Sequence, residues 1–221
     1  MLIAGITGQN NRSGTASLVS SFFSSWGKKI SIVDYGDIID LDAFRLKSYF
    51  YELAKNNTDI LLLKISPDDS DRAILQKTHF DIMIYVDKSD DIKGVNIDSY
   101  IKKMHRLFSL LNRKGIAIVN ADDAELLHFL DGRECCVVTF GFNPKASITA
   151  SSTGDTVFND TYMFCLQRSI VAINGTVIEP QEFRIKIDLM ETGEYNLLAA
   201  AAFSIVYGLD LNALSCATAK S

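Results

Sequence analysis

The first fifteen residues of the chain, MLIAGITGQNNRSGT (residues 1–15), carry the pattern that decides the fold. The short apolar run at residues 2–6 predicts a buried β-strand, which leads into a turn of small and polar residues. A helix is expected to begin near Ser13, because apolar side chains recur at helical spacing from there to Trp26. A strand, a glycine-containing turn and a helix in this order are typical of the first unit of a parallel α/β sheet.

The same alternation of short apolar runs and helix-period segments continues to about residue 140. Continuous runs of Val, Ile and Leu, separated by amphipathic helices, predict a mostly parallel sheet that is covered on both faces. The predicted strands of this part are residues 2–6, 30–33, 60–65, 82–86, 116–119 and 137–140.

From about Ala146 the pattern changes to shorter strand candidates. These are residues 147–150, 162–166, 170–173, 176–178 and 183–189. The dipeptide Asn174-Gly175 predicts a type I′ β-hairpin between two of them. Helical spacing returns at residues 194–207, and a further helix is expected from Leu211. The expected architecture is a three-layer α/β sheet, a small antiparallel β appendage and closing helices.

The composition excludes several classes of protein. The 221 residues carry a net charge of −5, so the chain lacks the basic surface that nucleic-acid binding requires. No apolar run approaches the roughly 20 residues that span a bilayer, and the first residues lack the basic region and cleavage site of a signal peptide. The four cysteines show no metal-ligand spacing and are expected to be buried free thiols. We therefore expect a cytoplasmic protein with no membrane or nucleic-acid partner.

The turn after the first predicted strand, residues 7–15 (TGQNNRSGT), is the candidate anion-binding loop. A working P-loop holds phosphates with backbone N–H groups, places a Lys on the terminal phosphates and a Ser or Thr hydroxyl on Mg²⁺. Here Arg12 stands in the place of that lysine, and Ser13 follows it. Taken alone, the turn also fits an ordinary connection between a strand and a helix.

Five segments resemble, in the same order, motifs of the central ATP-binding domain of Mur ligases. They are residues 8–13 (GQNNRS), similar to G-T-N-G-K-T/S; residues 100–108, which match Y-x-x-A-K-x-x-L-F at Tyr100, Leu107 and Phe108; residues 115–123 (GIAIVNADD), similar to the strand that ends in N-A-D-D; residues 137–141 (VVTFG), similar to V-x-T-F-G; and residues 193–202 (GEYNLLAAAA), similar to G-x-F-N-x-x-N-A-L-A-A.

The resemblance implies the fold of that domain over the whole chain, as one unit. The parallel α/β core is expected at residues 1–142, the β appendage at 143–190 and the closing helices at 191–221. The N-terminal UDP-sugar domain and the C-terminal domain of a complete Mur ligase are expected to be absent.

The resemblance also implies a set of nucleotide- and phosphate-binding residues. They are Gly8, Gln9, Asn10, Asn11, Arg12, Ser13, Asn120, Asp123 and Asn196. For Asn120 a strand-end cap is an equally good interpretation, and for Asp122 and Asp123 so is the start of the next helix.

Several positions depart from the family's catalytic pattern. Mur ligases form amide bonds with ATP through an acyl phosphate, and Mg²⁺ ions bridge the phosphates. The third predicted strand ends in Lys64-Ile65-Ser66, where the family has E-x-S-S with its Glu on Mg²⁺, and a charged Lys has no lone pair for a metal. The lysine that many members carbamylate falls on Met104, which has the spacing of a core residue. The second Asn of the adenine-side motif falls on Ala199, and the His of D-H-L-D falls on Asp91.

Two functions fit this pattern. The first is a non-catalytic module that binds nucleotide or a smaller anion weakly and acts through a protein partner in peptidoglycan precursor synthesis. The second is a component of an ATP-dependent ligase for UDP-N-acetylmuramoyl peptides, whose other domains come from separate chains and in which Asp68, Asp69 or Asp91 replaces the lost metal ligands.

The combined losses favour the first function, because losing one preorganised electrostatic contact costs about 10²–10³ in rate. We therefore expect no catalytic residue, weak ATP binding and no Mg²⁺ at the family's metal site. Any anion is expected to bind at residues 8–15, where a helix N-terminus and Arg12 favour negative charge.

Overall fold

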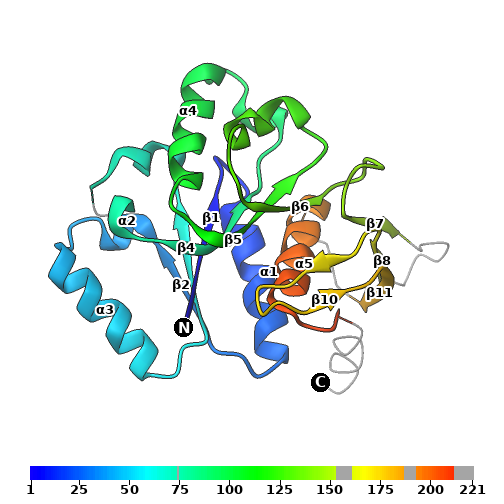
Figure 1. Ribbon diagram of the computed structural model, residues 1–221, viewed down its shortest axis with the longest axis horizontal. Helices are drawn as coiled ribbons and strands as arrows, with labels where there is room; N and C mark the ends of the chain where they lie inside the picture. The colour runs from blue at the N-terminus through cyan, green and yellow to red at the C-terminus, as the bar shows by residue number, and fades with distance from the viewer. Residues whose placement is uncertain (74, 153–160, 187–192, 212–221) are drawn as a thin grey trace.

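The computed structural model describes residues 1–73, 75–152, 161–186 and 193–211. Within them, a nine-stranded sheet forms the centre of the molecule, in the order β11-β8-β7-β6-β5-β4-β1-β3-β2 (Figure 1). Its strands are β1 (Leu2–Thr7), β2 (Ile30–Asp34), β3 (Ile60–Ile65), β4 (Phe80–Tyr85), β5 (Leu111–Asn120), β6 (Cys136–Phe140), β7 (Ile148–Ser152), β8 (Thr161–Leu166) and β11 (Gln181–Lys186).

The strands from β2 to β6 run parallel, which confirms the predicted mostly parallel sheet. β1 lies in the middle of this part, so Gly5 pairs with Leu63 of β3 on one side and with Met83 of β4 on the other. The central strands are apolar throughout because both of their faces are covered. In β3, for example, Leu62 belongs to the core on one face of the sheet and Leu61 to the core on the other.

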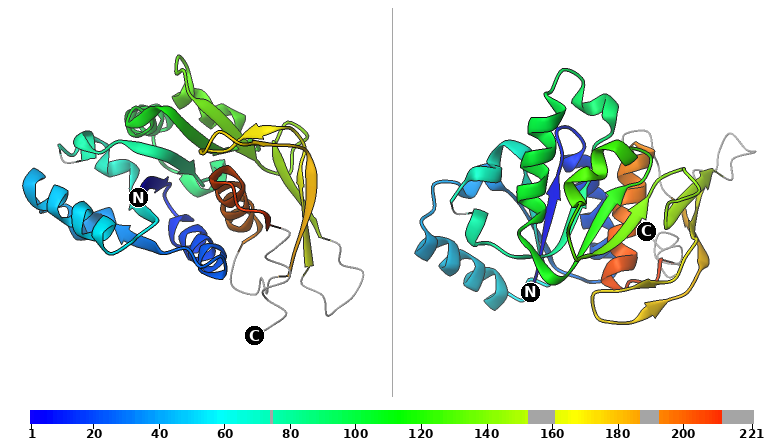
Figure 2. Two further views of the ribbon diagram at one scale, coloured as in Figure 1. Left: turned by 60° about the horizontal axis from the view of Figure 1, so that its bottom comes forward. Right: turned by 45° about the horizontal axis from the view of Figure 1, so that its top comes forward.

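Of the helices in the described residues, two cover one face of the sheet and the others lie on the opposite face (Figure 2). The first face carries α1 (Arg12–Ser25) and α5 (Glu194–Tyr207). The second carries α2 (Tyr35–Ile38), α3 (Ala43–Lys55), α4 (Ile97–Phe108) and the short 3₁₀ turns η1 (Pro67–Asp71), η2 (Leu75–Lys77), η3 (Ser89–Ile92) and η4 (Ala124–Leu130). The predicted helices near Ser13 and at residues 194–207 are both present.

Helix α5 is buried on all sides, because it lies between α1 and the sheet. Its residues from Leu197 to Val206 are all buried. The ring of Phe23 on α1 packs 5.3 Å from that of Phe203 and 4.9 Å from that of Tyr207, between ring centroids. This packing joins the last turns of the two helices, and the hydroxyl of Thr15 joins their first turns by a 3.0 Å hydrogen bond to Asn196, at the end of the molecule where the candidate loop lies.

The antiparallel strands continue the main sheet. β7 pairs with β6 in parallel, and β8 and β11 then add to it in antiparallel order. The only separate sheet among the described residues is the hairpin of β9 (Ile170–Val171) and β10 (Val177–Ile178).

The predicted type I′ turn in this hairpin is wrong. That turn needs a positive φ at both central residues, but Asn57 is the only described non-glycine residue with a positive φ. Instead, Gly175 (φ 85°) donates its N–H to the carbonyl of Ala172 at 2.8 Å, and the loop has three residues that end in a left-handed glycine. The N–H of Ile173 donates to the carbonyl of Val206 at 2.8 Å, which ties this loop to α5.

The expected burial of the cysteines is also wrong for the three that are described. Cys136 is exposed, and Cys135 and Cys165 are only half-buried. Cys136 is the first residue of β6, and Val137 beside it is also exposed. The helix expected from Leu211 falls outside the described residues. Within the described part of the chain, no helix is both long enough and apolar enough to cross a membrane.

Candidate functional site

The candidate loop leaves the carboxyl end of β1, between the ends of β3 and β4. Gly8 has a φ of 152°, and a Cβ on it would lie 2.6 Å from the Oδ1 atom of Asp87. Glycine is therefore required here both by the backbone conformation and by the close approach of a side chain. The loop ends at Arg12, where α1 begins.

An internal carboxylate occupies the first part of this loop. The N–H of Gln9 donates to Oδ2 of Asp87 at 2.6 Å, and the N–H of Asn10 lies 3.4 Å from Oδ1. The hydroxyl of Tyr100 on α4 donates to the same Oδ2 at 2.6 Å. Asp87 is fully buried. Two backbone N–H groups that could donate to a bound phosphate therefore already donate to a carboxylate of the protein itself.

Burial raises the pKa of Asp87 above its ordinary value, against the opposing effect of these three donors. Sequence reasoning missed Asp87. The available signal was an acidic residue directly after the apolar run at residues 82–86, which places it at the carboxyl end of a buried strand. That this strand lies beside β1 was not readable from the sequence.

A second acid fixes the middle of the loop. The side-chain amide of Asn11 donates to Oδ2 of Asp91 at 3.0 Å, and the N–H of Lys88 donates to the same oxygen at 2.9 Å. The side-chain amide of Asn10 reaches the Asp91 carbonyl at 3.2 Å. Both asparagines therefore hold the loop against η3.

The first turn of α1 is the part of the loop that stays open. Its N-cap residue, Asn11, makes no side-chain cap hydrogen bond. Within the described part of the chain, the guanidinium of Arg12 makes no hydrogen bond or ion pair, and its charge acts on the Asp34 carboxylate only through space. A helix N-terminus with an unpaired Arg favours an anion.

Lys64 lies where the resemblance places a metal-binding carboxylate. Its ammonium is 3.2 Å from Oδ2 of Asp34 and 3.3 Å from Oγ of Ser13. Burial acts to raise the pKa of Asp34, but the N–H of Gly36 and the Lys64 ammonium outweigh it and hold that pKa below its ordinary value. Strands β2 and β3 and the first turn of α1 thus bring a carboxylate, an ammonium and a hydroxyl together.

The residues present do not fit a divalent metal ion at this position. A charged ammonium has no lone pair to offer a metal. Among the described residues, no group of three or more His, Cys, Asp or Glu side chains is arranged to hold a metal ion.

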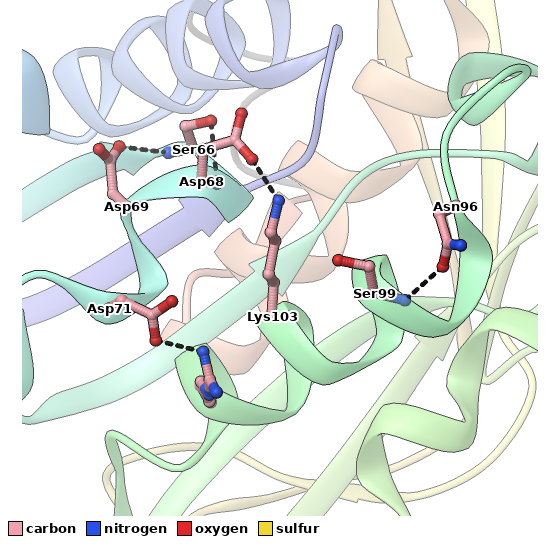
Figure 3. A network of polar contacts seen from close by, with 8 residues as sticks. Ser66, Asp68, Asp69, Asp71, Asn96, Ser99 and Lys103 are labelled. Carbon is pink, nitrogen blue, oxygen red and sulfur yellow. Dashed lines mark hydrogen bonds and ion pairs between the residues drawn. The ribbon is translucent and has the colours of Figure 1, made fainter.

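The acids proposed as replacement ligands are engaged elsewhere. Asp68 pairs with Lys103 at 2.6 Å, and Asp69 accepts the N–H of Ser66 at 3.2 Å, as Figure 3 shows. The neighbouring Asp71 pairs with Arg106. Asp91 holds Asn11, as described above. These contacts tie η1 to α4 and give Asp68 and Asp69 structural roles.

Met104 is a core residue, as its spacing predicted. It is fully buried, and the hydroxyl of Thr7 points toward its sulfur at 3.9 Å. The position that aligns with the family's helix lysine is thus apolar and closed.

The first turn of α5 links the loop to the remaining predicted site residues. The hydroxyl of Thr15 donates to Oδ1 of Asn196 at 3.0 Å. The neighbouring Tyr195 donates its hydroxyl to Asp122 at 2.8 Å, and the Lys88 ammonium lies 4.1 Å from the centre of its ring. A pocket of about 210 Å³ lies between these elements, next to Asn11.

The structure brings Asn196 to the loop, whereas Asn120 and Asp123 lie at the end of β5, two strands from β1. Oδ1 of Asn120 accepts the N–H of Asp122 at 3.0 Å, which is the strand-end cap that was the alternative interpretation. Its buried side-chain nitrogen makes no hydrogen bond within the described part of the chain. Asp123 directly precedes η4. Asp122 instead binds the N–H groups of Phe142 and Asn143, each at 2.8 Å.

Comparison with known families gives one match that spans most of the chain. The family described as the Mur ligase middle domain matches residues 6–206. Two similar curated proteins are UDP-N-acetylmuramoyl-L-alanyl-D-glutamate–2,6-diaminopimelate ligases. The one from Chlamydia trachomatis is 26% identical over 67% of this chain and 33% of its own length. The one from Bacillus cereus is 22% identical over 96% of this chain and 45% of its own length. The chain thus spans less than half of these relatives.

Solved structures show the same fold. A UDP-N-acetylmuramoyl-L-alanyl-D-glutamate–2,6-diaminopimelate ligase superposes with a TM-score of 0.69 at 19% identity, over 98% of this chain and 45% of its own. A bifunctional folylpolyglutamate synthase/dihydrofolate synthase from Yersinia pestis, complexed with AMPPNP and a Mn ion, superposes with a TM-score of 0.63 at 10% identity, over 98% of this chain and 57% of its own.

Proposed function

This chain belongs to the Mur ligase middle-domain family, and from that premise we propose that it is a non-catalytic module that binds nucleotide or a simpler phosphate anion weakly. Its relatives are UDP-N-acetylmuramoyl-L-alanyl-D-glutamate–2,6-diaminopimelate ligases by name, and we place its role in peptidoglycan precursor synthesis. In this role it acts through a protein partner that carries or regulates ligase domains.

The observation that carries the proposal is the Asp87 carboxylate in the loop. It takes up the N–H groups of Gln9 and Asn10, so an incoming phosphate finds fewer donors. It also adds a buried negative charge close to the place where an anion would bind, and like charges repel at short range. The first turn of α1 and Arg12 still offer donors, so binding is weakened but retained.

A thermal-shift titration with phosphate, sulfate and ATP tests this proposal. We compare the wild-type protein with Arg12→Ala and with Arg113→Ala, an exposed arginine at the amino end of β5 on the opposite edge of the sheet. Wild type and Arg113→Ala should show equal stabilisation, with a dissociation constant of roughly 1 mM, or about −4 kcal/mol. Arg12→Ala should lose more than half of the shift. Equal stabilisation of all three proteins would show that the loop is only a turn.

A ligase component that works with separate chains is the second candidate. The observation in its favour is that Arg12 and Ser13 keep a cation and a hydroxyl at the loop positions that handle phosphates and Mg²⁺ in a working P-loop. The two candidates differ in turnover. Formation of ADP from Mg²⁺–ATP in the presence of a UDP-N-acetylmuramoyl peptide and an amino acid, abolished by Ser13→Ala, would establish the second.

A further inference from the structure

Two neighbouring strands, β2 and β3, and the first turn of α1 place three different polar groups at one point of the carboxyl edge of the sheet. In the register of the sheet, Lys64 of β3 is paired with Ile6 of β1 and with Asp34 of β2. Its ammonium lies 3.2 Å from the Asp34 carboxylate and 3.3 Å from the Ser13 hydroxyl. The Lys64 side chain is 21% exposed. The ammonium is therefore held in place and still open to solvent on one side.

These contacts are those of a cation-binding position. In a working P-loop the Ser or Thr hydroxyl at the start of the helix binds Mg²⁺, and here that hydroxyl belongs to Ser13. A carboxylate beside it, such as Asp34, is the other type of ligand that Mg²⁺ prefers. Both oxygens instead accept from the Lys64 ammonium, which carries three N–H donors. Two of the donors are in use, so one is left for a further oxygen.

A divalent ion has no place beside this ammonium. Two positive charges at contact distance repel at a protein surface, and a doubly charged ion repels more than a singly charged one. The nearby Asp68 and Asp69, which would have to offset this repulsion, contact Lys103 and the Ser66 N–H.

From this arrangement we infer that the Lys64 ammonium takes the place of the divalent cation, so that phosphate-rich ligands bind to this protein without Mg²⁺. The inference rests on the proposed function, since it needs an anion at the first turn of α1. The third N–H of Lys64 and the guanidinium of Arg12 then supply the positive charge that Mg²⁺ supplies in a working P-loop. A ligand that is already complexed with Mg²⁺ has less negative charge and binds less tightly.

Calorimetric titration of inorganic triphosphate and of ATP, in EDTA and in excess MgCl₂, tests the inference. The proteins are wild type, Lys64→Met, which keeps the length of the side chain without its charge, and Lys114→Met, at an exposed lysine at the amino end of β5, as the matched control. Wild type and Lys114→Met should bind at least about threefold more tightly in EDTA than in Mg²⁺. Lys64→Met should lose roughly tenfold in EDTA, the usual worth of a charge-assisted hydrogen bond.

Asp34→Asn is the complementary variant, because it keeps a side-chain oxygen for the Gly36 N–H but removes the charge that competes for Lys64. It should bind triphosphate in EDTA more tightly than wild type, and it keeps the test valid if Lys64→Met folds poorly.

The possible results distinguish a failure of this inference from a failure of the proposed function. Binding by wild type that requires Mg²⁺, or equal affinities of wild type and Lys64→Met in EDTA, overturns the inference and leaves the proposed function standing. The absence of binding by wild type in both conditions overturns the proposed function and this inference with it.

Discussion

The carboxylate of Asp87 accepts a 2.6 Å hydrogen bond from the backbone N–H of Gln9, although 78 positions separate the two residues in sequence. The contact joins the end of β4 to the loop after β1, and Tyr100 adds a third donor to the same carboxylate from α4. A buried carboxylate without such donors would be strongly unfavourable. The loop after β1, strand β4 and helix α4 are therefore joined at this carboxylate. The conformation of the loop depends on a side chain of the protein and not on a bound ligand.

Asp87→Ala should lower the free energy of unfolding by about 2–4 kcal/mol, because it leaves the buried hydroxyl of Tyr100 and the partly buried N–H of Gln9 without their acceptor, at about 1–3 kcal/mol each. Asp71→Ala is the control, since it removes an exposed ion pair with Arg106 and should cost no more than about 1 kcal/mol. Urea denaturation measures both. Equal losses in the two variants would mean that Asp87 does not support the loop.

The raised pKa of Asp87 predicts a pH dependence of stability. Because its folded pKa lies above the ordinary value of about 3.9, the folded state holds this proton more tightly than the unfolded state does. The contribution of Asp87 to stability therefore falls as the pH rises from about 4 through the folded pKa, and then levels off. Asp87→Asn cannot titrate. The unfolding free energy of this variant minus that of wild type should thus increase over that window, and a constant difference from pH 4 to pH 8 would contradict the assignment.

The fold was predictable because its strands are buried on both faces. In β3, Ile60 and Leu62 pack into the core on one face of the sheet. Leu61 and Leu63 pack into the core on the other face. Such an unbroken apolar run, set between helix-period segments, is typical of a parallel strand with a helix layer on each side. The turn at Asn174 was mispredicted because its type depends on a tertiary contact, the hydrogen bond from Ile173 to Val206. Local sequence does not contain that information.

The site was predictable in part. The absence of a metal carboxylate at Lys64 and the apolar character of Met104 could be read directly from the sequence. The contacts around these positions could not be read from the sequence, because Asp34 ends β2 and Asp87 follows β4, and the positions of these two strands beside β3 and β1 depend on the order of strands in the sheet. An acidic residue that follows a predicted strand can be recognised in the sequence. The residue that it contacts cannot, because that depends on the topology of the sheet.

Met104→Lys would restore the family's helix lysine in sequence but should not restore its chemistry. Position 104 is fully buried beside Thr7. A lysine there would be an unpaired charge in an apolar core, so we expect a loss of about 3–5 kcal/mol in the free energy of unfolding. Lys103→Met, on the half-buried neighbouring position, removes one ion pair with Asp68 and should cost about 1 kcal/mol or less. A Met104→Lys protein as stable as wild type would show that this part of the core is open.

Gly8→Ala should destabilise the protein for two separable reasons. The φ of 152° is a conformation that a residue with a side chain rarely adopts, and the added Cβ would lie 2.6 Å from Oδ1 of Asp87 and 2.9 Å from a side-chain carbon of Val86. Gly132→Ala is the matched control, because Gly132 also has a positive φ (75°) but has open space where the Cβ would be. The control should lose about 1 kcal/mol from backbone strain alone.

Gly8→Ala should lose at least about 2–3 kcal/mol, since the buried Asp87 carboxylate must move away from the donors that hold it. Thermal and urea denaturation of the two variants measure the difference. The displaced carboxylate should also alter the effect of pH. The difference in unfolding free energy between the Asp87→Asn protein and the protein with Asp87 should depend on pH differently in the Gly8→Ala background than in wild type. If the two glycine variants lose the same stability, the close approach of Asp87 to the loop does not exist in solution.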